Sequence, residues 1–182
     1  CVRACCVIFS WNYCGVHRVR KKSKYKPRGV ILDPVGWIKQ GFTPISEHGS
    51  SLVTMRLRNH SALSSLGAGT GTSADFNLLI AAVNMTEALY RMGVGRDYNA
   101  QVKAGLAALR SVGRRSVGLG RFACEGQEMD DLNEVMDLHD AQLEVINVQQ
   151  MEKAMSIVSS EIRNKRATPI VGDGVDMPRE LV

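Results

Sequence analysis

Aromatic side chains and long apolar runs are both scarce in this chain. Phe, Trp and Tyr make up 5% of the 182 residues, whereas hydrophobic residues make up 45%. A core of that composition relies on Leu, Val, Ile, Met and Ala, which suit helices better than sheets. The best apolar stretch, residues 5–11, is far shorter than the roughly 18 residues that a membrane span needs. We therefore expect a soluble, all-α protein with no membrane partner.

Charge of one sign is missing from several long stretches. Residues 1–30 contain eight Lys and Arg but no acid, which leaves 15 basic against 18 acidic residues for the rest of the chain. The net charge of +5 therefore comes from an N-terminal arm on a mildly acidic body. No acid occurs between Tyr98 and Cys124, and no Lys or Arg between Phe122 and Gln150. Such an arm points to an anionic partner or to the acidic surface of the body itself.

Paired C-x-x-C motifs are also missing, although the chain has five cysteines. Four of them lie within the first 14 residues, at a spacing that does not fit a zinc site. Cys124 stands alone, and we expect a small, buried or half-buried apolar side chain there. Residues 1–18 show neither helical nor strand periodicity. We interpret them as translated leader ahead of a natural start near Val19.

The N-terminal arm, residues 1–28, cannot bury enough apolar surface to order itself, so we expect it to be disordered. Its cations suit the phosphates of DNA or RNA, and its tyrosine can stack on a base. The candidate nucleic-acid contacts are Arg20, Lys21, Lys22, Lys24, Tyr25, Lys26 and Arg28, with Arg114 and Arg115 adding to the surface from the body. A solubilising tail is the alternative interpretation.

The next segment, residues 29–51, alternates large apolar side chains with helix-breaking residues. The breaks are Pro34, Gly36, Gly41, Pro44 and Gly49. This punctuation disfavours long elements. We expect an irregular, extended strap with one helical turn near Trp37, whose apolar residues dock on the body.

The strongest helical pattern covers residues 73–92, where apolar side chains occupy most of the circumference at 3.6 residues per turn. Only a narrow polar strip remains, made of Asn84, Glu87 and Arg91. A helix of this kind must be surrounded, so we expect it at the centre of the domain. Thr72 and Asp75 predict a capping box at its start, and Gly93 predicts a left-handed residue after its end.

Four further helices are expected around this one, over residues 52–66, 97–112, 127–146 and 148–166. The first has Val53, Leu57, His60 and Ser64 on one line, with Leu63 and Leu66 beside it. The third has the apolar stripe Met129, Leu132, Met136, His139, Leu143 and Ile146. The fourth has the stripe Val148, Met151, Met155, Val158 and Ile162, and Asn147 with Gln150 predicts a capping box at its start. Bases in the second and acids in the third predict an antiparallel pair with surface ion pairs. The chain is therefore expected to form a bundle of about five helices over residues 52–166, followed by a disordered tail, 167–182.

Several polar residues lie on or beside the stripes that face the core: His60, Asn84, Glu87, His139 and Asp140. His139 and Asp140 are similar to the dyad that binds metal in helical phosphohydrolases, so a metal-dependent hydrolase is one hypothesis. A metal site needs at least three convergent ligands, however, and the sequence supplies few. We favour core histidines hydrogen-bonded to Glu87 or Asn59. We expect no catalytic residue, metal or cofactor.

From Arg20 to about Arg166, the chain resembles small, uncharacterised proteins of phages and prophages of proteobacteria. The motifs that carry this resemblance are RKKSKYKPRGV, RLRNHSAL, GTGT-x-AD, NMTEALYRMG and MDLHDAQL. The family brings no activity to carry over. It implies a phage or prophage origin and a place in the cytoplasm of a bacterial host cell.

Two functional hypotheses follow from these patterns. The first is a non-enzymatic accessory phage protein that contacts nucleic acid through its basic arm. The second is a helical protein-interaction or assembly module that acts on a phage or host protein, with a homo-oligomer as one form of it. The metal-dependent hydrolase is the third and weakest.

Overall fold

The computed structural model describes residues 33–164 and 166, which form helices joined by short connectors. The six α-helices are α1 (Pro34–Phe42), α2 (Gly49–Gly67), α3 (Ser73–Arg91), α4 (Asn99–Leu119), α5 (Gly126–Val145) and α6 (Val148–Arg163). Two short 3-10 helices, η1 (Ile45–His48) and η2 (Arg96–Tyr98), lie in the connectors. The described residues contain no strand, so the predicted all-α bundle is confirmed.

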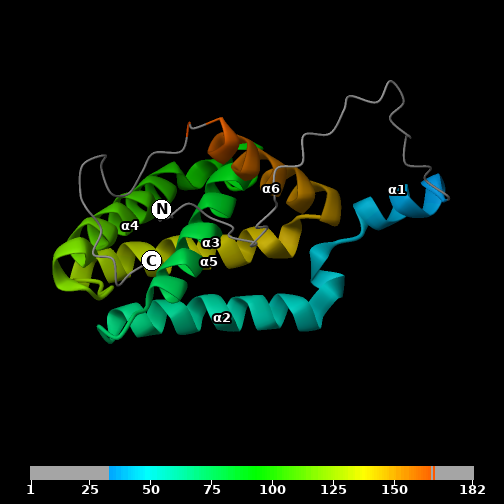
Figure 1. The fold of residues 1–182 in the computed structure, drawn as a ribbon. Coiled ribbons are helices and arrows are strands. Elements are labelled where there is room, and N and C mark those ends of the chain that lie inside the picture. The colour runs from blue at the N-terminus through cyan, green and yellow to red at the C-terminus, as the bar shows by residue number, and fades with distance from the viewer. Residues whose placement is uncertain (1–32, 165, 167–182) are drawn as a thin grey trace, which may run out of the picture.

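Helix α3 is the hub of the bundle, as its sequence predicts. It packs against α2, α4, α5 and α6 and crosses the middle of the molecule in Figure 1. The capping box at its start is present, because Asp75 N donates to Thr72 Oγ1 at 3.2 Å and Thr72 N donates to Asp75 Oδ2 at 2.9 Å. Gly93, just after its end, has the expected positive φ of 100°.

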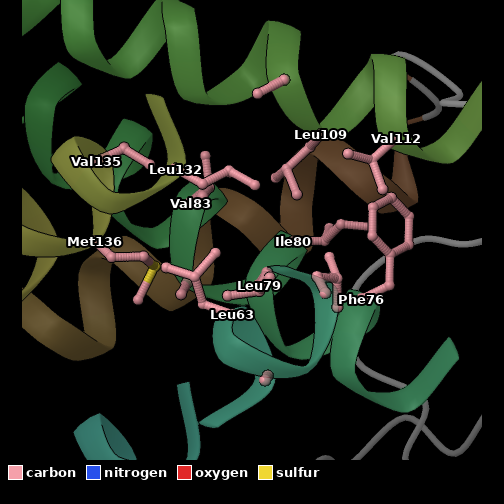
Figure 2. Packing of buried hydrophobic residues seen from close by; sticks show 14 of the residues in the cluster. Leu63, Phe76, Leu79, Ile80, Val83, Leu109, Val112, Leu132, Val135 and Met136 are labelled. Carbon is pink, nitrogen blue, oxygen red and sulfur yellow. The ribbon is translucent and has the colours of Figure 1, made fainter. Parts of the chain in front are cut away.

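The main core surrounds the N-terminal half of α3. Figure 2 shows side chains of α3 meeting those of α2, α4 and α5, with Phe76 and Ile80 beside Val112 of α4. Phe76 stacks on Phe122, with ring centroids 4.6 Å apart. Each fully buried side chain of this size stabilises the fold by about 1.5–3 kcal/mol through loss of apolar surface from water. A second cluster, around Leu89 and Leu143, fills the other end of α3.

The N-terminal segment differs from the expected irregular strap. Residues 34–42 form the nine-residue helix α1 instead of an extended chain with one helical turn. Asp33 caps this helix, accepting a hydrogen bond from Gly36 N at 2.8 Å, and Pro34 occupies its first position, where no amide hydrogen is needed. Proline and glycine therefore begin the helix here and do not break it. Figure 1 shows α1 extending from one end of the bundle.

Helix α2 faces the core with only part of the side that its sequence predicts. Val53 and Leu57, expected to face inward, are 64% and 68% exposed. The buried residues are Leu52, Asn59, Ala62, Leu63 and Leu66. This side is buried because it carries three leucines and the small Ala62, which lets α2 pack closely on α3. The row of Val53 and Leu57 is left facing solvent.

Backbone hydrogen bonds join the connectors in pairs at the two ends of the bundle. Near α1, Ile45 N donates to Ile146 O and Val148 N donates to Thr43 O, each at 3.0 Å. At the other end, the glycine-rich connector after α2 pairs with the connector after α4, because Phe122 N donates to Gly71 O at 3.3 Å. These bonds satisfy amides that short loops leave unpaired, and they hold the helix ends together.

Helices α4 and α5 form the antiparallel pair that the charge pattern predicts. They approach closely at Gly105, where an added Cβ would lie 2.6 Å from Cγ1 of Val135. At the far end, Arg115 Nη1 donates to Glu128 Oε1 at 3.0 Å, an ion pair between the two helices. Helix α4 runs on to Leu119, several residues beyond its expected end, before Gly120 ends it with a φ of 65°.

Helix α6 begins with the predicted capping box of Asn147 and Gln150. Only Ala154 is fully buried on it, whereas the expected stripe residues are half-buried or, for Met155, exposed. None of the described helices is long and apolar enough to cross a bilayer. The predicted leader, the basic arm and residues 167–182 of the tail lie outside the described residues.

Candidate functional site

A polar cluster lies on the seam between α2 and α5. His60 Nε2 and Asp140 Oδ2 are 2.9 Å apart, and Arg56 Nη2 donates to the backbone oxygen of Asp140 at 2.7 Å. Arg56 also donates to Glu144 Oε1 at 3.1 Å. The helices are antiparallel, so residues one turn apart on α2 meet residues one turn apart on α5. Of the predicted site residues, the fold thus brings His60 and Asp140 together.

Part of this cluster is incompletely paired. Arg56 Nε and Asp140 Oδ1 are buried without a hydrogen-bond partner and lie 3.6 Å apart, too far for a good hydrogen bond. The side chain of His60 is 41% exposed, so it is a surface residue at the seam and not the core histidine that we expected. Its partner is Asp140, and neither Glu87 nor Asn59 contacts it through a hydrogen bond in the described residues.

Among the histidines that the structure describes, only His139 is buried, with 2% of its surface exposed. Its Nδ1 lies 3.0 Å from Thr86 Oγ1, and that hydroxyl also lies 3.0 Å from the backbone oxygen of Ala82. A hydroxyl has only one proton to donate. Both contacts are hydrogen bonds when Thr86 Oγ1 donates to the backbone oxygen of Ala82 and accepts from the Nδ1–H group of a neutral His139 ring. The predicted burial is confirmed, but the partner is Thr86 of α3, one residue before the expected Glu87.

Burial lowers the pKa of His139 to about 4. The neighbouring Asp140 carboxylate favours the protonated ring, whereas Arg56 and His60 oppose it. A neutral ring is therefore the state that the core accepts at neutral pH. Next to it, Gln142 Nε2 donates to the backbone oxygen of Val94 at 3.0 Å and thereby ties α5 to the connector after α3.

The chemistry available at this seam is limited. A histidine beside a carboxylate resembles the base and orienting group of a hydrolase, but that arrangement also needs a nucleophile bonded to the histidine. In residues 33–164 and 166, no hydroxyl or thiol is hydrogen-bonded to His60. The same part of the chain contains no group of three or more His, Cys, Asp or Glu placed to hold a metal ion. The geometry therefore gives the hydrolase hypothesis no support.

The remaining polar candidates lie on the surface of α3. Glu87 accepts a 2.6 Å hydrogen bond from Arg91 Nη2, four residues later, as the helical spacing predicts. Asn84 is half-buried on the same strip. Both residues belong to the side of α3 that its neighbours leave uncovered, where polar side chains contact water.

Two of the predicted nucleic-acid contacts lie in the described part of the chain, and the structure places them differently. Arg114 is exposed. Arg115 is half-buried, and its guanidinium donates hydrogen bonds to Glu128 and to the backbone oxygen of Ala123. Burial alone raises the pKa of Glu128, but the hydrogen bonds from Arg115 and from the Glu125 amide bring that pKa below its usual value. Arg115 thus fixes the start of α5.

Charged residues form single-sign rows on the outer faces of two helices. On α4, the exposed residues at helical spacing are Lys103, Ala107, Arg110 and Arg114. On α5, they are Asp130, Glu134, Asp137, Ala141 and Glu144. We name these the basic row of α4 and the acidic row of α5. Among them, Glu144 has an ion-pair partner, Arg56.

An exposed apolar face on α1 completes the unusual surface features. Val35, Ile38 and Phe42 are 61%, 50% and 64% exposed, and their spacing puts them on one side of the helix. A different side of α1 faces α6, because an added Cβ at Gly41 would lie 3.6 Å from Cβ of Gln149. We name this side the apolar face of α1. Its sequence signal, apolar residues at i, i+3 and i+7, was interpreted as a strap that docks on the body.

The structure confirms the predicted burial of Cys124. It is half-buried against the main core, and burial raises the pKa of its thiol to about 11. A thiol with so high a pKa stays protonated at neutral pH and is a poor nucleophile. The candidate contacts Arg20, Lys21, Lys22, Lys24, Tyr25, Lys26 and Arg28 lie outside the described residues, and so do the first four cysteines.

Comparison of the chain with known protein families, curated proteins and solved structures finds no match. The function must therefore be argued from the surfaces of this chain itself.

Proposed function

We propose that the chain is a non-enzymatic helical module for protein interaction, and that its contact element is the apolar face of α1. The observation that carries this proposal is that all three large apolar side chains of that face are at least half exposed. Single exposed apolar residues are normal on protein surfaces. A helix that presents several of them on one side is the usual form of a helix that docks in a groove of a partner.

The attachment of α1 supports the same proposal. The connector after it is fixed by hydrogen bonds to the junction of α5 and α6, and Gly41 lies against α6. The helix is therefore held by its C-terminal end, and its apolar face points to solvent. A partner gains the burial of three apolar side chains, each contributing about 1.5–3 kcal/mol before the costs of association.

The charges around α1 indicate the chemistry of the partner. Asp33 at the start of α1 and Glu47 in η1 are exposed, and the exposed Lys39 of α1 lies between them in the sequence. A partner that fits this end of the bundle has an apolar groove bordered by charges of both signs. Such a protein of the phage or of its bacterial host would meet this chain in the cytoplasm.

Photo-crosslinking in living bacterial cells tests the proposal. The photoreactive analogue p-benzoylphenylalanine replaces Phe42 in one variant and Gln40, which is exposed on the opposite side of α1, in the matched control. We expect an adduct of one defined size from position 42 and none from position 40. The same adduct should disappear when Ile38→Asp puts a charge on the apolar face.

The outcome that contradicts the proposal is equally specific. Similar yields from positions 42 and 40, or a yield from position 42 that Ile38→Asp leaves unchanged, would show that the apolar face is not a contact surface. An adduct of twice the mass of the chain would identify a second copy as the partner. A different mass would identify another protein, to be confirmed by binding of the purified pair and its loss with Ile38→Asp.

A second function, nucleic-acid binding, is favoured by the basic row of α4. Lys103, Arg110 and Arg114 are exposed on the folded body, and their positive charge adds to that of the N-terminal arm in the sequence. Phosphate contacts of this kind weaken steeply with salt. The test is fluorescence anisotropy of labelled DNA and RNA over a salt series, for the full chain, for a chain without residues 1–28 and for Arg110→Gln with Arg114→Gln. Binding with a steep salt slope that both changes reduce supports this function, and absence of binding at low salt rejects it.

A further inference from the structure

An open groove of about 350 Å³ lies along α2, on the side away from the polar seam with α5. Two neighbouring rows of α2 line it, one of Ser50, Thr54 and Arg58 and one of Ser51, Met55 and Asn59. Leu78 of α3 forms the opposite wall. Members of each row are four residues apart, so one straight face of α2 forms the floor.

The lining of this groove is suited to an anion. The described residues of the lining include one guanidinium group, from the exposed Arg58, and no carboxylate. The hydroxyls of Ser50 and Ser51 form no hydrogen bond with the described residues, whereas the Thr54 hydroxyl donates to the backbone oxygen of Ser50 at 2.9 Å. Two hydroxyl donors are therefore available beside the cation.

Asn59 adds an amide to the lining of the groove. The residue is 5% exposed, and its side chain forms no hydrogen bond with any other residue that the structure describes. Its amide is nevertheless not among the enclosed polar atoms that lack a partner, which belong to Arg56, Asp140 and Gln142, so it is open to the groove, where a ligand can reach it. The two amide hydrogens are donors, as are the Arg58 guanidinium and the serine hydroxyls.

We propose that this groove binds a small organic carboxylate. Arg58 and the amide of Asn59 hold the carboxylate, and Ser50 and Ser51 add hydroxyl donors at its side. A short apolar portion of the ligand lies against Met55 and Leu78, which are half-buried and border the polar part of the groove. One full positive charge with neutral donors matches the single charge of a carboxylate better than the two charges of a phosphate monoester.

The test compares two probes of the same chain length, hexanoate and hexanamide, in which an uncharged NH2 group replaces one oxygen of the carboxylate. Each is added to the ¹⁵N-labelled full chain at constant ionic strength while amide chemical shifts are recorded. With hexanoate we expect saturable shifts of the Asn59 side-chain amide and of the backbone amides of 50–54. Hexanamide should bind at least ten-fold more weakly, and Arg58→Gln should weaken hexanoate by the same factor. Arg110→Gln, an exposed arginine on α4, is the matched control and should leave hexanoate binding unchanged.

Two sources provide such a carboxylate, a free small acid and the C-terminus of a polypeptide. Comparison of N-acetylleucine with hexanoate distinguishes them, because only N-acetylleucine carries its carboxylate on a peptide-like body; N-acetylleucinamide, which has no free carboxylate, is the control. Binding of N-acetylleucine tighter than that of hexanoate identifies a chain terminus as the preferred source, and the reverse order identifies a free acid. The proposal is overturned if hexanoate produces no saturable shifts, if hexanamide binds equally well, or if Arg58→Gln and Arg110→Gln have the same effect. Arg58 is exposed, and the spectrum of each variant reports directly whether it is folded.

Discussion

The burial of His139 makes the stability of the fold depend on pH in a range where few other groups titrate. In the unfolded chain its ring takes up a proton near the ordinary pKa of 6.5, whereas in the folded chain burial delays this to a pKa of about 4. Between these values the unfolded state binds more protons than the folded state. The free energy of unfolding therefore falls as the pH falls from 6.5 towards 4, and is restored above 6.5.

The size of the effect follows from the separation of the two pKa values. Each unit corresponds to about 1.4 kcal/mol, so the full loss is about 3 kcal/mol. About 2 kcal/mol of it should be lost between pH 7 and pH 5, above the range where most carboxylates titrate. The lowered pKa of Glu128 adds a further loss, which begins only as the pH falls below 4.5.

Urea unfolding at a series of pH values from 7 to 5, followed by circular dichroism, measures this directly. The matched variant is His139→Asn, which keeps a donor near the position of Nδ1 but does not titrate. Its absolute stability will be lower because the smaller side chain leaves a cavity, so the comparison rests on the slope with pH. Between pH 7 and pH 5, we expect the free energy of unfolding of the variant to fall by about 2 kcal/mol less than that of the parent protein. Parallel curves for the two proteins would refute the buried neutral histidine.

Three further predictions concern contacts that hold the helices together. Thr86→Val should lower the free energy of unfolding by about 1–3 kcal/mol, because it leaves the His139 ring nitrogen buried without its partner, whereas the exposed Thr54→Val should change it by less than about 0.5 kcal/mol. Gly105→Ala should destabilise by about 1–3 kcal/mol despite the better helix propensity of alanine, because its Cβ would meet Val135 at 2.6 Å, and Val135→Ala should recover part of the loss. Arg115→Met should cost about 1–2 kcal/mol by removing the ion pair at the start of α5.

Each of these predictions has its own contradicting result, and denaturant unfolding measures all three. A Thr86→Val protein as stable as the parent would mean that His139 finds another partner. Additive effects of the Gly105 and Val135 changes would mean that the two helices are not in contact there. Arg114→Met is the control for the adjacent arginine and should be neutral, so equal losses at 114 and 115 would contradict the assigned ion pair.

The sequence was sufficient for those elements whose local signals agreed with the packing. The central helix has an apolar surface on nearly every side, a capping box and a glycine after its end, and all three occur in the structure. The same agreement holds for the stripe of α5 and for the capping box of α6. In these segments only one arrangement buries the apolar residues, so pattern alone determines the outcome.

Helix α2 shows where a pattern of one helix is insufficient. Its sequence has two apolar rows, one through Val53 and Leu57 and one through Leu63 and Leu66, and periodicity does not choose between them. The choice depends on how closely α3 approaches, which is a property of the partner helix. The partners of His60 and His139 were missed for the same reason, since Asp140 and Thr86 become neighbours only through the packing of α2 and α3 on α5.

Helix α1 shows a different limit. Pro34 and Gly36 were interpreted as breaks, but a proline at the first position and an aspartate cap before it are also the signals of a helix start. Only the order of these residues distinguishes the two cases. This segment contains the surface on which the proposed function depends, because the apolar side chains of an extended strap would have no common face.

The yield of crosslinked product from position 42 of α1 in living cells is the most direct test of the proposed function. The account predicts one adduct of defined size that is absent when the photoreactive residue is moved to position 40 and is lost with Ile38→Asp. Equal labelling from the two positions, or labelling that persists in the Ile38→Asp protein, would contradict it.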